Sequence, residues 1–313
     1  MLASLPARAQ EAYPARPVRI IVPYAAGGPL DGMVRLISDR LSKRIGQPVL
    51  VDNRAGASGI IGAEATAKSA PDGYTMMISV MDTQINNAAL FKSLPYDPLK
   101  DFVQVTQIAS APTIMVANAD IPANTLREFV AYARANKGKL SYGSWAAGGT
   151  GHIMTEVFNR SQGLDMVHAP YKGEGPMVQD LLAKSIALGM ASIANAKQHV
   201  EKGSLKAYAV SGSARSAAVP DVPTLAELGF TDPIYQVKIW FGAHMPARTP
   251  ASISQKMQAE IKAVLELPEV ANVLNGRAFT PSGMAGEEFD RVFRSDYTVL
   301  TRLIKDLGIE IVQ

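Results

Sequence analysis

The sequence predicts an α/β fold of two domains that face each other across a cleft. Strand-like and helix-like segments alternate in both halves of the chain, which is typical of this fold class. The tetrapeptide Ala-Ala-Gly-Gly occurs twice, at 25–28 and 146–149, each time between a strand-like and a helix-like segment. No Ser/Gly-rich tether separates the halves, so short crossings should join them. The 313 residues are enough for two ordinary domains.

The N-terminal half predicts a β-α-β-α-β order. A short β-branched run at 18–22 indicates a buried strand, and apolar residues recur on one helical face over 33–45 until Gly46 ends the helix. The predicted strands lie at 18–22, 49–51 and 75–80, and the predicted helices at 33–45 and 59–68. This order indicates a parallel sheet with right-handed crossovers.

The middle of the chain repeats this pattern. Helices are predicted at 126–135, 150–161 and 175–183, and strands at 140–143, 166–169, 186–190 and 205–210. Segment 213–229 indicates a long loop with a short helix at Leu225. From 252 onward the chain is predicted mostly helical, at 252–265, 268–274 and 286–307.

Composition excludes several function classes. A net charge of +3, without a basic run interleaved with aromatics, argues against nucleic-acid binding, and no apolar stretch approaches the ~20 residues that span a bilayer. Cysteine is absent, which excludes disulfides, thiolate catalysis and cysteine metal sites and suits an oxidising compartment. The histidines lack ligand spacing such as H-x-x-x-H. We therefore expect no metal and no cofactor.

The N-terminus suggests export. Ala7-Arg8-Ala9 matches the A-x-A pattern that ends a secretory signal, although the expected apolar core does not precede it. A truncated signal or a late start codon would explain this, and an ordinary terminus rich in alanine is the alternative. We exclude residues 1–12 from the fold as a signal-peptide remnant.

Both Ala-Ala-Gly-Gly loops predict an anion site. The first N–H groups of a helix lack internal partners, the helix dipole adds partial positive charge, and small residues admit a ligand to the backbone. Either loop alone is weak evidence, because many α/β turns hold glycines only for packing, and we favour that explanation for a single loop. Together, two helix N-termini across a cleft predict one small carboxylate held at both ends. Asp31 suits N-capping of the first helix better than direct ligand contact.

Six stretches carry a resemblance to a known family. They are YPARPVRIIVPYAAGGPLDGMVRLI (13–37), GQPVLVDNRAGASGIIGAEATAKSAPDGYT (46–75), LPYDPLKDF (94–102), KLSYGSWAAGGTGHIMTEVF (139–158), VHAPYKGEGPMVQDLLA (167–183) and AVPDVPTLAELG (218–229). Together they resemble the Bug family, the extracytoplasmic solute receptors of tripartite tricarboxylate transporters. The resemblance implies a periplasmic-binding-protein clamshell with two interdomain crossings, with 13–112 plus 240–313 in one domain and 113–239 in the other.

The resemblance also implies a function and a set of ligand-binding residues. It implies a monomeric periplasmic receptor that passes a small carboxylate, either a dicarboxylate or an aromatic carboxylate, to the membrane subunits of a transporter. The implied ligand contacts are Tyr24, Ala26, Gly27, Gly28, Asp31, Met81, Asp82, Thr83, Ala147, Gly148, Gly149, Thr150, Gly151, His152, Tyr171, Lys172 and Ser192. Pro29-Leu30 and Ala191 depart from the family pattern and remove polar groups, which implies a less polar ligand with an aromatic or aliphatic middle.

Two other function classes remain open. A nicotinamide-dependent enzyme is suggested by glycines 149 and 151, but Met154 stands where the dinucleotide fingerprint needs its third glycine, and no G-x-S-x-G elbow is present. A ligand sensor that feeds a signalling partner is also compatible with a clamshell. A DNA-binding regulator is disfavoured because no helix-turn-helix fits before residue 18.

Three side chains have two interpretations each. His152 either donates to the ligand or takes a surface or capping role. Arg54 is a carboxylate clamp or, as we favour, a residue that ties its loop. Trp145 either forms an apolar wall of the site or packs in the core or hinge.

Overall fold

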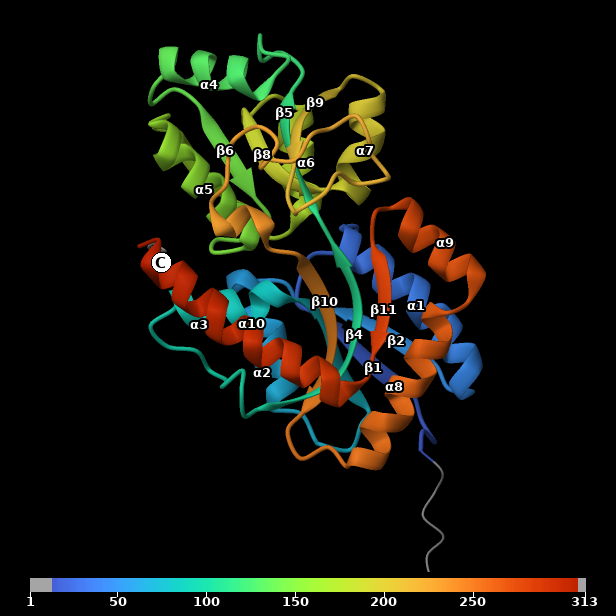
Figure 1. Cartoon of the computed structure of the whole chain (residues 1–313). Coiled ribbons are helices and arrows are strands. Elements are labelled where there is room, and N and C mark those ends of the chain that lie inside the picture. The colour runs from blue at the N-terminus through green and yellow to red at the C-terminus, as the bar shows by residue number, and fades with distance from the viewer. Residues whose placement is uncertain (1–12, 309–313) are drawn as a thin grey trace, which may run out of the picture.

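The strands divide between two sheets, one in each domain (Figure 1). The computed structural model describes residues 13–308, so the predicted signal-peptide remnant at 1–12 lies outside the described residues. We call the domain that contains the six-stranded sheet the first domain and the one that contains the five-stranded sheet the second domain. The predicted α/β fold class is confirmed.

The first sheet has the strand order β11-β4-β10-β3-β1-β2. Its strands are β1 (Val18–Val22), β2 (Val49–Asn53), β3 (Thr75–Val80), β4 (Phe102–Ala111), β10 (Ile239–Pro246) and β11 (Thr280–Met284). β1 pairs parallel with β2 and β3, whereas β10 pairs antiparallel with β3 and β4. The parallel pairing predicted for the strands at 18–22, 49–51 and 75–80 is therefore confirmed. The sheet is mixed because β10 enters it on its return from the second domain.

The second sheet has the strand order β7-β6-β8-β5-β9. Its strands are β5 (Thr113–Asn118), β6 (Ser141–Ser144), β7 (Val167–Pro170), β8 (Leu188–Ser192) and β9 (Leu205–Val210). β6 is parallel to β7 and β8, and β5 is antiparallel to β8 and β9. This sheet is mixed for the same reason, since β5 arrives directly from the first domain.

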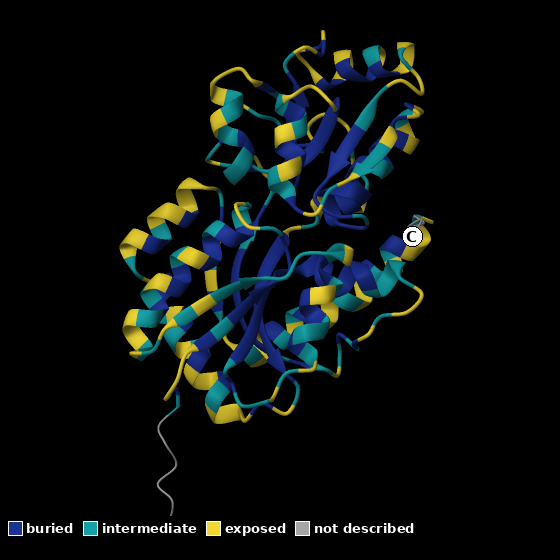
Figure 2. Cartoon of the chain, turned by 180° about the vertical axis from the view of Figure 1, so that it is seen from behind, coloured by how far each residue is buried: buried dark blue, intermediate teal, exposed yellow. Residues whose placement is uncertain are grey.

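Helices cover both sheets, with buried residues facing the sheets and exposed residues facing outward (Figure 2). The helices of the first domain are α1 (Pro29–Ile45), η1 (Ala57–Gly59), α2 (Ile60–Ala67), η2 (Met81–Thr83), α3 (Ile85–Leu90), α8 (Ala251–Leu265), α9 (Pro268–Gly276) and α10 (Gly286–Asp306). Those of the second are α4 (Leu126–Ala135), α5 (Thr150–Gln162), α6 (Glu174–Leu182), α7 (Ile193–Glu201) and η3 (Pro233–Gln236). The C-terminal α8 and α10 both pack on β4 of the first domain.

The sequence explains the first strand and helix. Strand β1 is almost fully buried because it lies between two strands and under helices, so its residues are apolar except for Arg19. Helix α1 begins at Pro29, whose missing N–H costs nothing in the first turn, and buries Met33, Ile37 and Leu41 as predicted. It ends at Gly46, which takes the left-handed conformation with φ 69°.

Two chain crossings join the domains side by side. Pro112 alone separates β4 from β5, and the return leads from η3 through 237–238 into β10. The two crossings are paired, since Ile239 lies opposite Ala111 in the β10–β4 ladder. The helix predicted at Leu225 is absent from the described residues, because that segment consists of turns. Strands β4, β5, β10 and β11 and helices α3 and α7 were not predicted.

Candidate functional site

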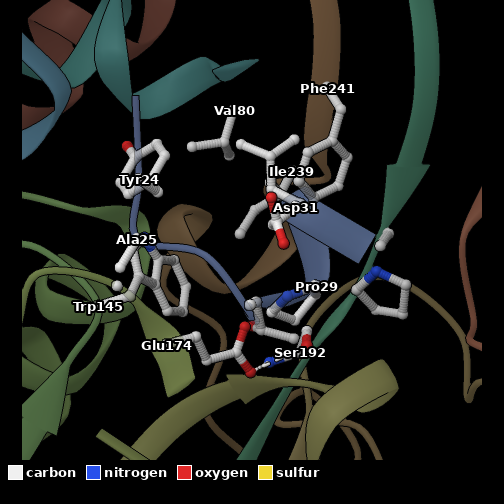
Figure 3. A pocket seen from close by; sticks show the side chains of 16 residues that line it. Tyr24, Ala25, Pro29, Asp31, Val80, Trp145, Glu174, Ser192, Ile239 and Phe241 are labelled. Carbon is white, nitrogen blue, oxygen red and sulfur yellow. Dashed lines mark hydrogen bonds between the residues drawn. The ribbon is translucent and has the colours of Figure 1, made fainter. Parts of the chain in front are cut away.

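A cavity of about 70 Å³ lies between the domains, beside the two crossings (Figure 3). Its walls are mostly apolar and come from both domains. They comprise Tyr24, Ala25, Gly28, Pro29, Leu30, Asp31, Val80, Ala111, Pro112, Thr113, Trp145, Gly173, Glu174, Ser192, Ile239 and Phe241. No lysine, arginine or histidine of residues 13–308 lines this cavity. Any charge recognition there depends on backbone groups and on the acidic side chains.

The N-terminus of α1 opens into the cavity. Gly28 is the N-cap with extended backbone, φ −80° and ψ 170°, and Pro29 follows as the first helical residue. The N–H groups of Gly28, Leu30 and Asp31 have no hydrogen-bond partner among the described residues. All three residues line the cavity. Free amides at the positive end of a helix dipole form an anion-binding site.

Asp31 shapes this loop from inside the helix. It is the third residue of α1 and not the predicted N-cap. It accepts hydrogen bonds from the Gly27 amide at 3.0 Å, Arg35 Nε at 2.9 Å and Asn53 Nδ2 at 3.0 Å. Burial alone would raise its pKa, but these bonds, that from Arg35 foremost, outweigh burial and hold the pKa below its ordinary value. Its charge is thus compensated, so it does not exclude an anion from the adjacent amides.

A second carboxyl group faces the cavity from the other domain. Glu174 Oε1 accepts from the Ser192 amide at 2.6 Å and from Ser192 Oγ at 2.9 Å. Ser192 is also the N-cap of α7 and accepts from the Asn195 amide, so it holds Glu174 on a rigid helix start. Burial raises the pKa of Glu174 to about 7, although the bonds from Ser192 oppose the rise.

The second Ala-Ala-Gly-Gly loop already holds an anion, and that anion belongs to the protein. Asp82, in η2 directly after β3, is only 2% exposed. Its Oδ2 accepts from the Thr150 amide at 3.0 Å and from Trp145 Nε1 at 2.9 Å, and its Oδ1 accepts from Thr150 Oγ1. The start of α5 is therefore occupied by a carboxylate from the first domain. In this structure the expected two-ended clasp has a single open end, at α1.

Further bonds around Asp82 tie the domains together. Asn86 Nδ2 donates to Asp82 Oδ1 at 3.0 Å and to the Gly148 carbonyl at 3.1 Å. Ser58 Oγ donates to the Ala147 carbonyl at 2.8 Å. The second Ala-Ala-Gly-Gly loop thus contacts the first domain through its carbonyl acceptors, and the flanking Trp145 and Thr150 supply the donors.

His152 takes the capping role of its two interpretations. Its Nδ1 accepts from the Gly148 amide at 3.0 Å, and its ring stacks on His168 with centroids 3.7 Å apart. Burial, with a smaller effect of Arg160, lowers its pKa to about 4, so the ring is neutral at physiological pH. It stabilises the loop and lies outside the cavity lining.

The structure brings some of the predicted site residues together and separates others. Tyr24, Gly28, Asp31 and Ser192 line the cavity. The remaining predicted residues do not line it: Ala26, Gly27, Met81, Asp82, Thr83, Ala147, Gly148, Gly149, Thr150, Gly151, His152, Tyr171 and Lys172. Gly27 faces a neighbouring groove, Thr83 Oγ1 is hydrogen bonded to Tyr24 at 3.1 Å, and Tyr171 donates to Asp180. Arg54 bonds Asp52 in the preceding strand, in line with the loop-tying interpretation.

Sequence reasoning missed or left open several residues of the cavity. Trp145 has both of its proposed roles, because its ring lines the cavity and its Nε1 bonds Asp82. Glu174 was missed, since an acid in the first turn of a helix is ordinarily explained by the helix dipole. The apolar wall from Ile239 and Phe241 was missed because β10 itself was not predicted.

Two classes of feature are not found within residues 13–308. No helix there is long and apolar enough to cross a membrane. No group of three or more His, Asp or Glu side chains in that range could hold a metal ion.

Comparisons with known proteins agree with this architecture. The profile of the family described as tripartite tricarboxylate transporter family receptor matches residues 33–309. Protein BugT of Bordetella pertussis is 36% identical over 272 residues, covering 87% of this chain and 83% of BugT. MatC of Rhodopseudomonas palustris, solved with bound malate, has a TM-score of 0.87 and 30% identity over 93% of this chain and 100% of MatC. A second R. palustris protein, solved with adipate, has a TM-score of 0.90 and 31% identity over 96% of this chain and 100% of that one. The likeness spans both domains and confirms the predicted clamshell.

Proposed function

Because this chain belongs to the family of tripartite tricarboxylate transporter receptors, as the Bug proteins do, we propose that it captures a small carboxylate in the periplasm. The solute binds between the two domains, 13–112 with 240–313 and 113–239, and is passed to the membrane subunits of such a transporter. This role is binding and release, and it needs no catalysis and no cofactor.

One observation carries the proposal, namely the free amide groups of α1 in the interdomain cavity. The N–H groups of Gly28, Leu30 and Asp31 have no partner in the described chain and lie at the positive end of a helix of 17 residues. A carboxylate can accept several of them, and charge-assisted bonds of this kind contribute about 1.5–3 kcal/mol each. Micromolar affinity corresponds to about 8 kcal/mol, which a few such bonds and apolar contacts can supply.

The apolar walls narrow the class of solute. Val80, Trp145, Ile239 and Phe241 surround the space next to the amides, so the body of the solute is hydrocarbon or aromatic. The malate and adipate in the two R. palustris structures are small carboxylates and support this class. A carboxylate with an aliphatic or aromatic middle therefore fits the cavity best.

A thermal-shift screen tests the proposal. Mono- and dicarboxylates with aliphatic and aromatic bodies are added to the purified protein, and hits are titrated by calorimetry. A solute that binds only the folded state raises the melting temperature. At a concentration one hundred times its Kd, it adds about 2.7 kcal/mol to the free energy of unfolding. A carboxylate hit with micromolar or tighter affinity supports the proposal. A screen in which no carboxylate binds more tightly than about 1 mM overturns it.

A further inference from the structure

The polar groups of the cavity are distributed unequally between the two domains. The first domain offers donors, the free amides of Gly28, Leu30 and Asp31. The second offers an acceptor on the facing wall, the carboxyl group of Glu174. Beside it lie the amides of Gly173 and Glu174 at the start of α6, which also have no hydrogen-bond partner among the described residues. The two walls come close together, since a Cβ placed on Gly173 would lie 3.5 Å from the Ala25 Cβ. One small solute can therefore contact both.

Only one of the two carboxylate oxygens of Glu174 is hydrogen bonded within the described protein. Both of its hydrogen bonds, from the Ser192 amide and hydroxyl, go to Oε1. Oε2 has no hydrogen-bond partner among the described residues, and Figure 3 shows that this oxygen is directed away from Ser192, towards the side of Ala25 and Pro29. An acceptor held rigidly in a mostly apolar wall is complementary to a donor on the solute.

The cavity wall makes a second carboxylate unfavourable at this end. No basic side chain of the described residues lines the cavity, and Asp31 is already paired with Arg35. The free carboxylate of a dicarboxylate would face Glu174 with no cation between them, so one of the two acids would have to take up a proton. An N–H donor meets no such penalty and forms a charge-assisted bond.

We propose that Glu174 selects solutes that carry an N–H donor, as an ammonium or amide group, at the end opposite the carboxylate that α1 binds. The preferred class is thus an amino acid or acid amide with its two polar ends separated by an apolar body, and not a plain dicarboxylate. This inference rests on the proposed function, because it presumes that a carboxylate is bound at α1.

Pairs of solutes with the same chain length test the inference. Calorimetry at about pH 8 compares succinate with 4-aminobutanoate, glutarate with 5-aminopentanoate, and adipate with both 6-aminohexanoate and adipic acid monoamide. The proteins are the wild type, Glu174→Gln, and Glu287→Gln as a control that removes the same charge from an exposed helix start. The Glu174→Gln side chain keeps an oxygen for Ser192, and a melting curve checks the fold of this variant.

In the best-binding pair we expect the wild type to bind the N–H-bearing member at least tenfold tighter than the dicarboxylate. Glu174→Gln should reduce this preference at least tenfold, and Glu287→Gln should leave it unchanged. Equal or tighter binding of the dicarboxylate by the wild type, or an unchanged preference in Glu174→Gln, overturns the inference and leaves the proposed function standing. If no member of any pair binds any of the three proteins, the inference fails, and the proposed function fails as well only if no carboxylate of the wider thermal-shift screen binds.

Discussion

The substitution Asp82→Asn tests how the contact between the two domains is held. Asp82 is buried and accepts four hydrogen bonds, three of them from Trp145 and Thr150 of the second domain and one from Asn86 of the first. In asparagine one oxygen becomes an NH₂ group, which cannot accept. With that group in the place of Oδ2, the Trp145 indole and the Thr150 amide would lose their acceptor.

The size of the effect follows from these contacts. Two hydrogen bonds to a charged acceptor contribute about 3–6 kcal/mol together, at about 1.5–3 kcal/mol each. Burial raises the pKa of Asp82, so the charged form already carries a desolvation cost that asparagine removes. We expect a net loss of about 3 kcal/mol in the free energy of unfolding.

Fluorescence offers a local assay. The chain has two tryptophans, and in a Trp240→Phe background the emission reports Trp145, whose Nε1 bonds Asp82. Urea unfolding is followed by this emission in that background with and without Asp82→Asn, and Asp120→Asn is the control. Asp120 is exposed and pairs with Lys184 on the surface, so its replacement should cost less than about 1 kcal/mol. A loss below about 1 kcal/mol for Asp82→Asn would refute our account of the interdomain contact.

Four further predictions concern other residues in and around the interdomain contact and the cavity. Gly149→Val should lower the free energy of unfolding in urea about as much as Asp82→Asn does, because a Cβ at this position would lie 3.1 Å from Asp82 Oδ2. The two losses should not add in the double variant, and additive losses would contradict this prediction. Because its pKa is raised to about 7, Glu174 keeps its proton in the folded protein between about pH 4.5 and 7, where the unfolded chain has lost it. The free energy of unfolding of the solute-free wild type, relative to Glu174→Gln, should therefore fall by about 1–2 kcal/mol from pH 5 to 8. A rise over this range would refute the prediction. Asp31→Ala should cost about 1–3 kcal/mol in thermal unfolding by leaving its loop donors unpaired, and an unchanged melting temperature would contradict that. Lys172→Ala should leave solute affinity within twofold by calorimetry, since this exposed residue lies outside the cavity lining, and a tenfold loss would place the solute elsewhere.

Local patterns in the sequence were sufficient to predict the strand-turn-helix units. The apolar run of β1, the one-sided apolar face of α1 and its terminal Gly46 are all features of neighbouring residues, and the structure has them within a few positions. The direction of a strand that pairs with a distant part of the chain cannot be predicted in this way. Strand β10 is antiparallel because it pairs with β4, more than a hundred residues earlier in the chain, and no local pattern encodes that pairing.

The candidate site also combines features that local sequence predicts with features that depend on long-range contacts. The open amides of α1 follow from local helix chemistry, and the sequence predicted them. The second loop has the same local chemistry, but its donors are already bonded to Asp82, which is 68 positions from Thr150 in the chain. A long-range contact thus decides which of two similar loops is free to bind a solute. Glu174 also acquires its place in the cavity only when Ser192, 18 positions away, holds it.

A crystal structure of the complex with the tightest-binding carboxylate tests the central claim most directly. We predict that the solute lies in the interdomain cavity, with a carboxylate oxygen about 2.7–3.2 Å from at least two of the amide nitrogens of Gly28, Leu30 and Asp31. In the same structure Asp82 should still accept from the Thr150 amide. A carboxylate bound at Thr150 with Asp82 displaced, or bound outside the cavity, would contradict the account.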